Sequence, residues 1–269
     1  MITIRRYKKA ESIEEAWQLN QQKSSRIIGG MLWLKMGKGT VQTAIDLSGL
    51  SLDGIEETEE EFRVGCMATL RQLELHEGLG TYTGGAMKEA LRHIVGVQFR
   101  NLATVGGSIF GRFGFSDVLT MFLAMDSYVE LYKAGVVSMR EFAGGGYDRD
   151  VLVRILVRKQ PASFHYSSVR NSQTDFPALT CAAARFEGPA GADYRFAIGA
   201  RPGRAVVIED SGRILSGGDI REQARAFGEY AAAHVPTGSN MRGSAQYRTH
   251  LVKVLTERAI LQMGGEAGC

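Results

Sequence analysis

The chain has 269 residues, of which 44% are hydrophobic and 23% are charged, so it is long enough for a substantial core and has an ordinary globular composition. Its 32 basic and 29 acidic residues give a formal net charge of +3, and because no stripe of Lys and Arg accompanies this excess we expect no nucleic-acid partner. No apolar run approaches the roughly 20 residues that span a bilayer, and the N-terminus lacks the features of a signal peptide. We therefore expect a cytoplasmic protein with no membrane partner.

The first fifty or so residues predict a small parallel α/β unit, because strands and helical segments alternate along them. In chain order the expected elements are a strand at 2–4, a helix at 13–20, a strand at 26–28, a helical turn at 31–36 and a strand at 43–47. The basic run at 5–9 is interpreted as a solvated edge rather than as a binding patch.

The following segment, 53–158, predicts a larger mixed α+β unit. Its expected elements are a strand at 62–65, a helix that begins at Thr69, helices at 86–95 and 118–125, and strands at 128–132 and 151–157. Three consecutive glycines at 144–146 predict a flexible or tight loop, because glycine tolerates backbone conformations that other residues avoid.

Pro161 marks the expected domain boundary, since proline cannot extend a strand ladder. Beyond it the sequence predicts antiparallel strands at 162–168, 178–186, 194–200 and 204–209, then a helix that starts at Asp219 and a last helix from about Ser244 to Met263. The expected fold class is α+β, with a two-part domain at 1–158 (subdomains about 1–52 and 53–158) and a C-terminal antiparallel sheet with helices at 162–264.

Two glycine pairs follow predicted strands, and both are candidates for binding a phosphate. The first is in Ile27-Ile28-Gly29-Gly30 and the second is in Ala103-Thr104-Val105-Gly106-Gly107-Ser108. Glycines allow a close approach to the main chain, and bare N–H groups at a helix start can hold a phosphate. Two tight structural turns would give the same pattern. The presence of two such turns favours a dinucleotide pyrophosphate.

Ser116-Asp117 precedes the predicted helix at 118–125, where it can cap the helix or accept hydrogen bonds from a sugar or ribityl hydroxyl. No GxGxxG, P-loop or G-x-S-x-G motif is present. The histidines are scattered, and Cys66, Cys181 and Cys269 have neither zinc nor iron–sulfur spacing. We expect no catalytic residue and no metal ligand on this chain, with Cys66 and Cys181 buried or incidental and Cys269 in a disordered Gly-rich tail. Chemistry would then be carried by a cofactor.

The second glycine turn belongs to a longer motif. Residues 97–108, VQFRNLATVGGS, with Ser116-Asp117 after them, resemble the signature Q-x-R-N-x-A-T-x-G-G-N/S … S-D of the FAD-binding medium subunit of molybdenum hydroxylases. That family includes xanthine dehydrogenases, carbon monoxide dehydrogenase and nicotinate dehydrogenase. Residues 27–30, 44–47, 168–183 and 246–259 are also similar to the family, so the likeness extends over most of the chain.

The resemblance implies that FAD is the cofactor and that the two glycine turns hold its pyrophosphate. The FAD contacts that it implies are at Ile27, Ile28, Gly29, Gly30, Met31, Leu32, Leu34, Ile94, Ala103, Thr104, Val105, Gly106, Gly107, Ser108 and Asp117. It also implies two partners, a small subunit with [2Fe-2S] clusters and a large molybdopterin subunit. Electrons would pass from the clusters to FAD and then to NAD or another acceptor, with purine or N-heterocycle oxidation as the expected reaction of the whole complex.

This chain departs from the family pattern in two places. Met31 and Leu32 stand where many relatives have Thr or Asn and a polar residue, so only backbone N–H donors remain there. Tyr166 corresponds to a Lys near the flavin in some relatives. An FAD-less scaffold subunit of the same kind of complex is therefore the alternative, and a self-contained flavin oxidase of the wider fold is a third hypothesis, for which we see no acid–base residues.

Overall fold

The computed structural model describes residues 1–189 and 191–264, which divide into two compact units. The first unit comprises residues 1–75, 96–111 and 127–158, and the second comprises 76–95, 112–126 and the chain from residue 159 onward. The tail that ends at Cys269 lies outside the described residues. Within the described part of the chain, no helix has the length and apolar character needed to cross a bilayer. The domain limits predicted at residues 158 and 162 stay a prediction.

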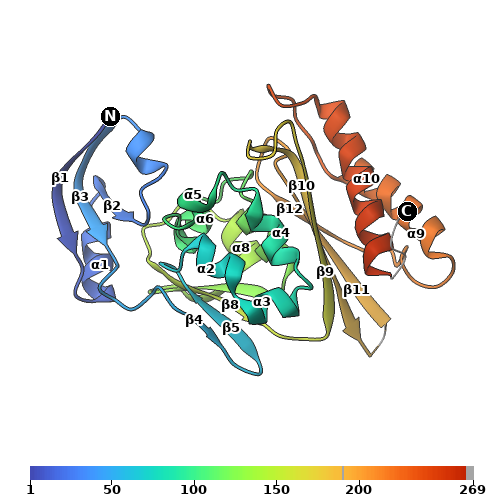
Figure 1. Ribbon diagram of the computed structural model, residues 1–269, viewed down its shortest axis with the longest axis horizontal. Helices are drawn as coiled ribbons and strands as arrows, with labels where there is room; N and C mark the ends of the chain where they lie inside the picture. The colour runs from blue at the N-terminus through green and yellow to red at the C-terminus, as the bar shows by residue number, and fades with distance from the viewer. Residues whose placement is uncertain (190, 265–269) are drawn as a thin grey trace. The chain divides into compact units, whose positions relative to one another are not determined.

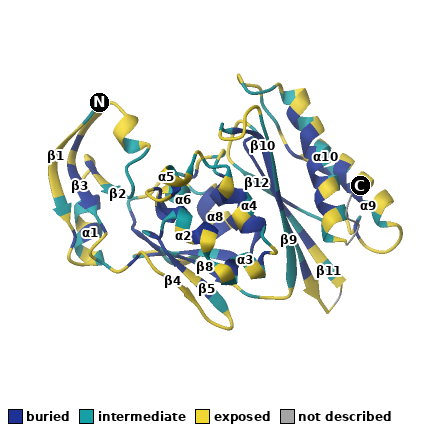
Figure 2. Ribbon diagram, viewed as in Figure 1, coloured by how far each residue is buried: buried dark blue, intermediate teal, exposed yellow. Residues whose placement is uncertain are grey.

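The first unit contains a three-stranded parallel sheet in the order β1-β3-β2, as the alternation of strand and helix predicts (Figure 1). Its elements are β1 (Ile2–Lys9), α1 (Ile13–Asn20), β2 (Ser25–Ile28), the 3-10 helix η1 (Leu34–Met36) and β3 (Gly39–Asp46). The basic run at 5–9 extends β1 rather than following it. Figure 2 shows this edge strand as largely exposed, which agrees with the interpretation as a solvated edge.

A five-stranded antiparallel sheet in the order β4-β5-β8-β6-β7 forms the other part of the first unit. Its strands are β4 (Ile55–Glu57), β5 (Glu61–Gly65), β6 (Ser127–Leu131), β7 (Gly135–Ser138) and β8 (Leu152–Arg158), and its helices are α2 (Leu70–Leu75), α5 (Val97–Arg100), α6 (Val105–Phe110) and α8 (Met139–Gly144). The prediction of a loop at 144–146 is wrong at its first position, because Gly144 ends α8. The capping box of Ser138 and Glu141 starts that helix.

The second unit is built on a four-stranded antiparallel sheet in the order β12-β11-β10-β9, which confirms the expected C-terminal sheet. Its elements are α3 (Glu77–Tyr82), α4 (Ala86–Arg92), α7 (Asp117–Ala124), β9 (Ala162–Arg170), β10 (Pro177–Gly188), β11 (Gly191–Gly199), β12 (Val206–Glu209), α9 (Ile220–His234) and α10 (Ala245–Met263). Alternate residues of β10 point to opposite faces. Leu179 and Cys181 therefore pack with α9 and α10, while Thr180 faces α7, where its hydroxyl contacts that of Thr120.

Candidate functional site

The glycine turn at 104–108 is the start of helix α6. Thr104 is the N-cap residue, and its Oγ1 accepts a hydrogen bond of 3.1 Å from the N–H of Gly107. The N–H groups of Val105 and Gly106 donate to the carbonyls of Ala68 and Cys66, both at 2.8 Å, and the N–H of Ser108 donates to the Thr104 carbonyl at 3.1 Å. The N–H groups of residues 105–108 therefore already have protein acceptors.

Gly106 is required for packing rather than for a special backbone angle. A Cβ atom at this position would lie 2.7 Å from the carbonyl oxygen of Cys66 and 2.9 Å from the Cβ of Cys66. Both separations are far below normal van der Waals contact, so no side chain fits between α6 and the segment after β5. The glycine lets helix α6 start directly against the backbone of residues 66–69.

The first glycine loop, at 29–32, follows β2 and contacts the second turn. A Cβ atom at Gly29 would lie 2.4 Å from Thr104 Oγ1, and one at Gly30 would lie 1.8 Å from the Leu102 carbonyl oxygen. The ring of Trp33 also meets that of Phe99 edge-on, with centroids 6.0 Å apart. The two glycine segments, which are about seventy residues apart in sequence, thus form one continuous surface within the first unit.

The first loop differs from the second in its free donors. Among the hydrogen bonds of the described residues, none is donated by the N–H groups of residues 29–32. Met31 has a left-handed backbone conformation with φ of 58°, and its side chain packs with Leu34 against the small core of Ile28, Val41 and Ala44. The Met31 side chain thus makes a core contact, whereas the backbone N–H donors of the loop stay available.

A buried ion pair between Arg100 and Glu74 connects α5, the helix before the second glycine turn, to α2. The Nε and Nη2 atoms of Arg100 donate to the two carboxylate oxygens of Glu74, at 2.8 and 3.2 Å, and both side chains are only about a twentieth exposed. Burial by itself would raise the pKa of Glu74, but the hydrogen bonds from Arg100 and Arg71 outweigh it and hold this pKa below its usual range. Arg100 belongs to the sequence motif at 97–108, but no role could be predicted for it from the sequence. No sequence pattern indicated that Glu74 belongs to the site.

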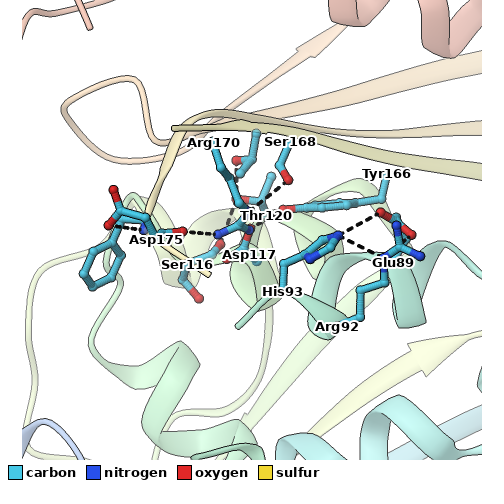
Figure 3. A network of polar contacts seen from close by, with 12 residues as sticks. Glu89, Arg92, His93, Ser116, Asp117, Thr120, Tyr166, Ser168, Arg170 and Asp175 are labelled. Carbon is cyan, nitrogen blue, oxygen red and sulfur yellow. Dashed lines mark hydrogen bonds and ion pairs between the residues drawn. The ribbon is translucent and has the colours of Figure 1, made fainter. Parts of the chain in front are cut away.

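Asp117 lies in the second unit, at the first position of α7, and is buried (Figure 3). The hydroxyl of Tyr166 and the guanidinium of Arg170 both donate to its Oδ1 atom. Burial raises the pKa of the Asp117 carboxyl, against the opposing charge of Arg170, and burial together with Asp117 raises the pKa of Tyr166 well above its ordinary value. Ser116 caps α7 through the N–H of Leu119, so the capping and carboxylate roles fall on two neighbouring residues.

Arg170 connects Asp117 to a second acidic residue. Its Nη1 donates to the carbonyl of Asp175 at 2.7 Å, and the carboxylate of Asp175 accepts two hydrogen bonds from Arg242, at 2.9 and 3.3 Å (Figure 3 shows the Arg170 and Asp175 part). Arg242 and Phe176 also line a cavity of about 350 Å³ in the same unit. Of the predicted FAD contacts, only Ile94 and Asp117 belong to the second unit, and the others belong to the first.

Cys66 and Cys181 are buried core residues. Burial raises the pKa of the Cys66 and Cys181 thiols to about 12, so both are held protonated and unreactive at neutral pH. In residues 1–189 and 191–264, no three His, Cys, Asp or Glu side chains are grouped so as to hold a metal ion.

Comparison with known proteins places these features in a family. Residues 3–158 match the family described as "FAD binding domain in molybdopterin dehydrogenase", and residues 164–263 match that described as "CO dehydrogenase flavoprotein C-terminal domain". The chain is 25% identical to the nicotine 6-hydroxylase medium subunit of Paenarthrobacter nicotinovorans, over 96% of this chain and 97% of that protein. It is 26% identical to the xanthine dehydrogenase FAD-binding subunit of Escherichia coli O157:H7, over 83% and 82% of the two chains. A crystal structure of Cu,Mo-CO dehydrogenase shares the fold, with a TM-score of 0.88 at 20% identity over 99% of this chain and 100% of that chain.

Proposed function

The chain belongs to the family of FAD-binding domains of molybdopterin dehydrogenases, and from this premise we propose that it binds FAD and transfers electrons as the medium subunit of a molybdenum hydroxylase complex. The observation that carries the proposal is the contact between Gly29-Gly30 and residues 102–104. A side chain at either glycine would clash with residues 102–104. The first loop also has backbone N–H donors without protein acceptors among the described residues.

The residues of the junction fit the pyrophosphate of FAD. A diphosphate needs several converging donors, and backbone N–H groups of residues 29–32 can supply them. The Thr104 hydroxyl lies beside Gly29 at the same junction. We therefore assign the phosphate contacts chiefly to the first loop, with Thr104 as a side-chain contributor and residues 105–108 as the rigid support. Ile94 and Asp117 remain proposed contacts to the rest of the cofactor.

When bound, FAD would supply the exchange between one-electron and two-electron carriers that a flavin can perform. The proposed electron source is a [2Fe-2S] small subunit, and a molybdopterin large subunit would oxidise the substrate. The name of the nicotine 6-hydroxylase relative, like that of the xanthine dehydrogenase relative, supports an N-heterocycle or purine as substrate of the whole complex. We propose NAD or another acceptor as the final electron acceptor.

A titration of the full-length apoprotein with FAD tests the proposal. We expect quenching of flavin fluorescence, a shifted visible flavin spectrum and a rise in melting temperature that grows with FAD concentration, because a ligand of the native state stabilises it. AMP and riboflavin, each carrying half of the contacts and no pyrophosphate, serve as controls and should bind much more weakly. A folded protein that shows neither quenching nor a thermal shift at saturating FAD would instead be the FAD-less scaffold subunit.

Electron transfer needs the native complex rather than the isolated chain. Copurified subunits should contain molybdenum, iron and FAD, and addition of a substrate N-heterocycle without an acceptor should bleach the flavin absorbance. If the iron–sulfur clusters are reduced but the flavin stays oxidised, the electron-transfer part of the proposal is wrong while FAD binding stands.

A further inference from the structure

We propose that Arg100 and Glu74 are positioning residues for the FAD site: their buried ion pair fixes segment 101–104 against the first glycine loop. This inference rests on the proposed function, because it concerns the same FAD site. Neither residue is among the FAD contacts implied by the family resemblance. The argument comes from the geometry of the pair, its place in the chain and the energetics of buried ion pairs.

The pair has a geometry that fixes orientation as well as distance. Arg100 presents Nε and Nη2 as a fork to both oxygens of Glu74, and Arg71 donates from the other side to Oε2 at 2.9 Å. A planar fork on a carboxylate allows only one relative orientation of the two groups, unlike the contact of a lysine. Helices α5 and α2, which carry Arg100 and Glu74, are thereby held in one arrangement.

Arg100 lies just before residues 102–104, which contact Gly29-Gly30 at the proposed phosphate site. The segment after it is tied back to α5 by the N–H of Ala103, which donates to the Phe99 carbonyl at 2.8 Å, and to α2 by the N–H of Leu70, which donates to the Ala103 carbonyl at 2.8 Å. The Leu102 carbonyl is the group against which Gly30 packs. A rotation of α5 would therefore move the Leu102 carbonyl and the Thr104 cap together.

A direct role of Arg100 in holding a phosphate is the competing explanation, since the residue lies four positions before Thr104. The structure argues against it. Two of its guanidinium nitrogens are engaged by Glu74, and the side chain is only 5% exposed. An arginine that binds a phosphate needs its fork directed at the ligand, whereas this fork is directed at Glu74.

The energetics also favour positioning over simple stabilisation. A buried ion pair adds little net stability compared with apolar side chains of similar volume, because removing both charges from water offsets their attraction. Removal of one partner alone is strongly destabilising, since it leaves an uncompensated buried charge. A pair retained here for geometry should thus be replaceable by an apolar pair without loss of stability, but with loss of FAD affinity.

Four variants of the full chain test this: Arg100→Met, Glu74→Leu, the double variant of both, and Arg100→Lys. We measure the urea midpoint of the apoprotein, the dissociation constant of FAD by fluorescence and the phosphorus NMR shifts of bound FAD. The single apolar variants should lose both stability and FAD affinity. The double variant should regain the wild-type urea midpoint, yet bind FAD about tenfold or more weakly, as expected for one lost hydrogen bond to a charged phosphate.

Arg100→Lys covers the case in which the double variant does not fold. It keeps the charge that neutralises Glu74 but not the fork, so it should fold, bind FAD about tenfold more weakly and shift the phosphorus resonances. The matched control is the exposed pair of Arg185 and Glu187, whose apolar double variant should change neither FAD affinity nor the resonances.

Two results would overturn the inference. One is a double variant that regains FAD affinity together with stability, and the other is an Arg100→Lys protein that binds FAD within twofold of wild type with unchanged phosphorus shifts. A wild-type chain that binds no FAD would instead refute the proposed function, so the two failures are distinguishable.

Discussion

Thr104 Oγ1 faces Gly29 so closely that a Cβ atom at Gly29 would lie 2.4 Å away from it. The same oxygen caps helix α6 by accepting the N–H of Gly107. One side-chain atom thus joins the end of β2 to the start of α6, and it can do so only because residue 29 has no side chain. The first two predictions test this junction.

Gly29→Ala should lower the urea midpoint of unfolding and weaken FAD binding. The added methyl group forces Thr104 to rotate, which removes the helix cap at a cost of about 1 kcal/mol. Adding Thr104→Gly should relieve the clash, because glycine at an N-cap costs only a few tenths of a kcal/mol. The double variant should then be more stable than Gly29→Ala alone in urea unfolding, and simple additivity of the two changes would contradict the contact.

Gly30→Ala should be more damaging than Gly29→Ala. Its Cβ atom would lie 1.8 Å from the Leu102 carbonyl oxygen, which is backbone and cannot rotate away. We expect a loss of about 3 kcal/mol in the free energy of unfolding, in the range of severe overpacking. Gly144→Ala is the matched control, because nothing lies within 4 Å of its Cβ position at the end of α8. Its urea midpoint should equal or slightly exceed that of wild type, and equal effects of the two changes would contradict the packing argument.

Local patterns predict most of the strands but miss β4 and β7, the two edge strands of the five-stranded sheet. The parallel sheet could be predicted because β2 and β3 are apolar segments separated by recognisable turns. Strand β4 could not, because Ile55-Glu56-Glu57 has no alternation of apolar and polar residues and becomes a strand only by pairing with β5. Strand β7 starts at Gly135, whose φ of 71° is typical of a turn, so the local sequence predicts a turn rather than a strand there.

The candidate site could be predicted only in part, because some of its contacts come from residues distant in sequence. Glycine pairs after strands are a local signal, and the prediction holds for the first loop, because Gly29-Gly30 follow β2. It is wrong for the second pair, because Gly106-Gly107 follow the helix α5 rather than a strand and lie inside α6. The acceptors of the turn's N–H groups, Cys66 and Ala68, come from a segment almost forty residues earlier, so no local pattern shows that these donors are occupied. Glu74 is a further example, because an acidic residue in a short helix normally indicates a solvated face.

Glu74 should make the stability of the first unit sensitive to acid. Its pKa in the folded protein lies below the usual value of about 4.3 for a glutamate. The ion pair therefore contributes stability above that unfolded-state pKa, and the contribution is lost as the pH falls through the lower folded-state pKa. Urea midpoints measured from about pH 6 down to about pH 3 should fall more steeply for wild type than for Glu74→Gln. Glu187→Gln, at an exposed pair, should follow the wild-type slope.

Asp117→Asn separates the structural role of this carboxylate from its proposed contact with FAD. The change leaves the guanidinium of Arg170, only 7% exposed, facing a neutral amide, so the apoprotein should lose about 3 kcal/mol in the free energy of unfolding. Asp175→Asn is the control, because the Asp175 pair with Arg242 is partly exposed and should cost at most about 1 kcal/mol. A drop in FAD affinity at temperatures where Asp117→Asn remains folded would support a contact with the cofactor. An unchanged affinity would show that Asp117 serves only to hold Tyr166 and Arg170, and an unchanged urea midpoint would contradict the buried ion pair itself.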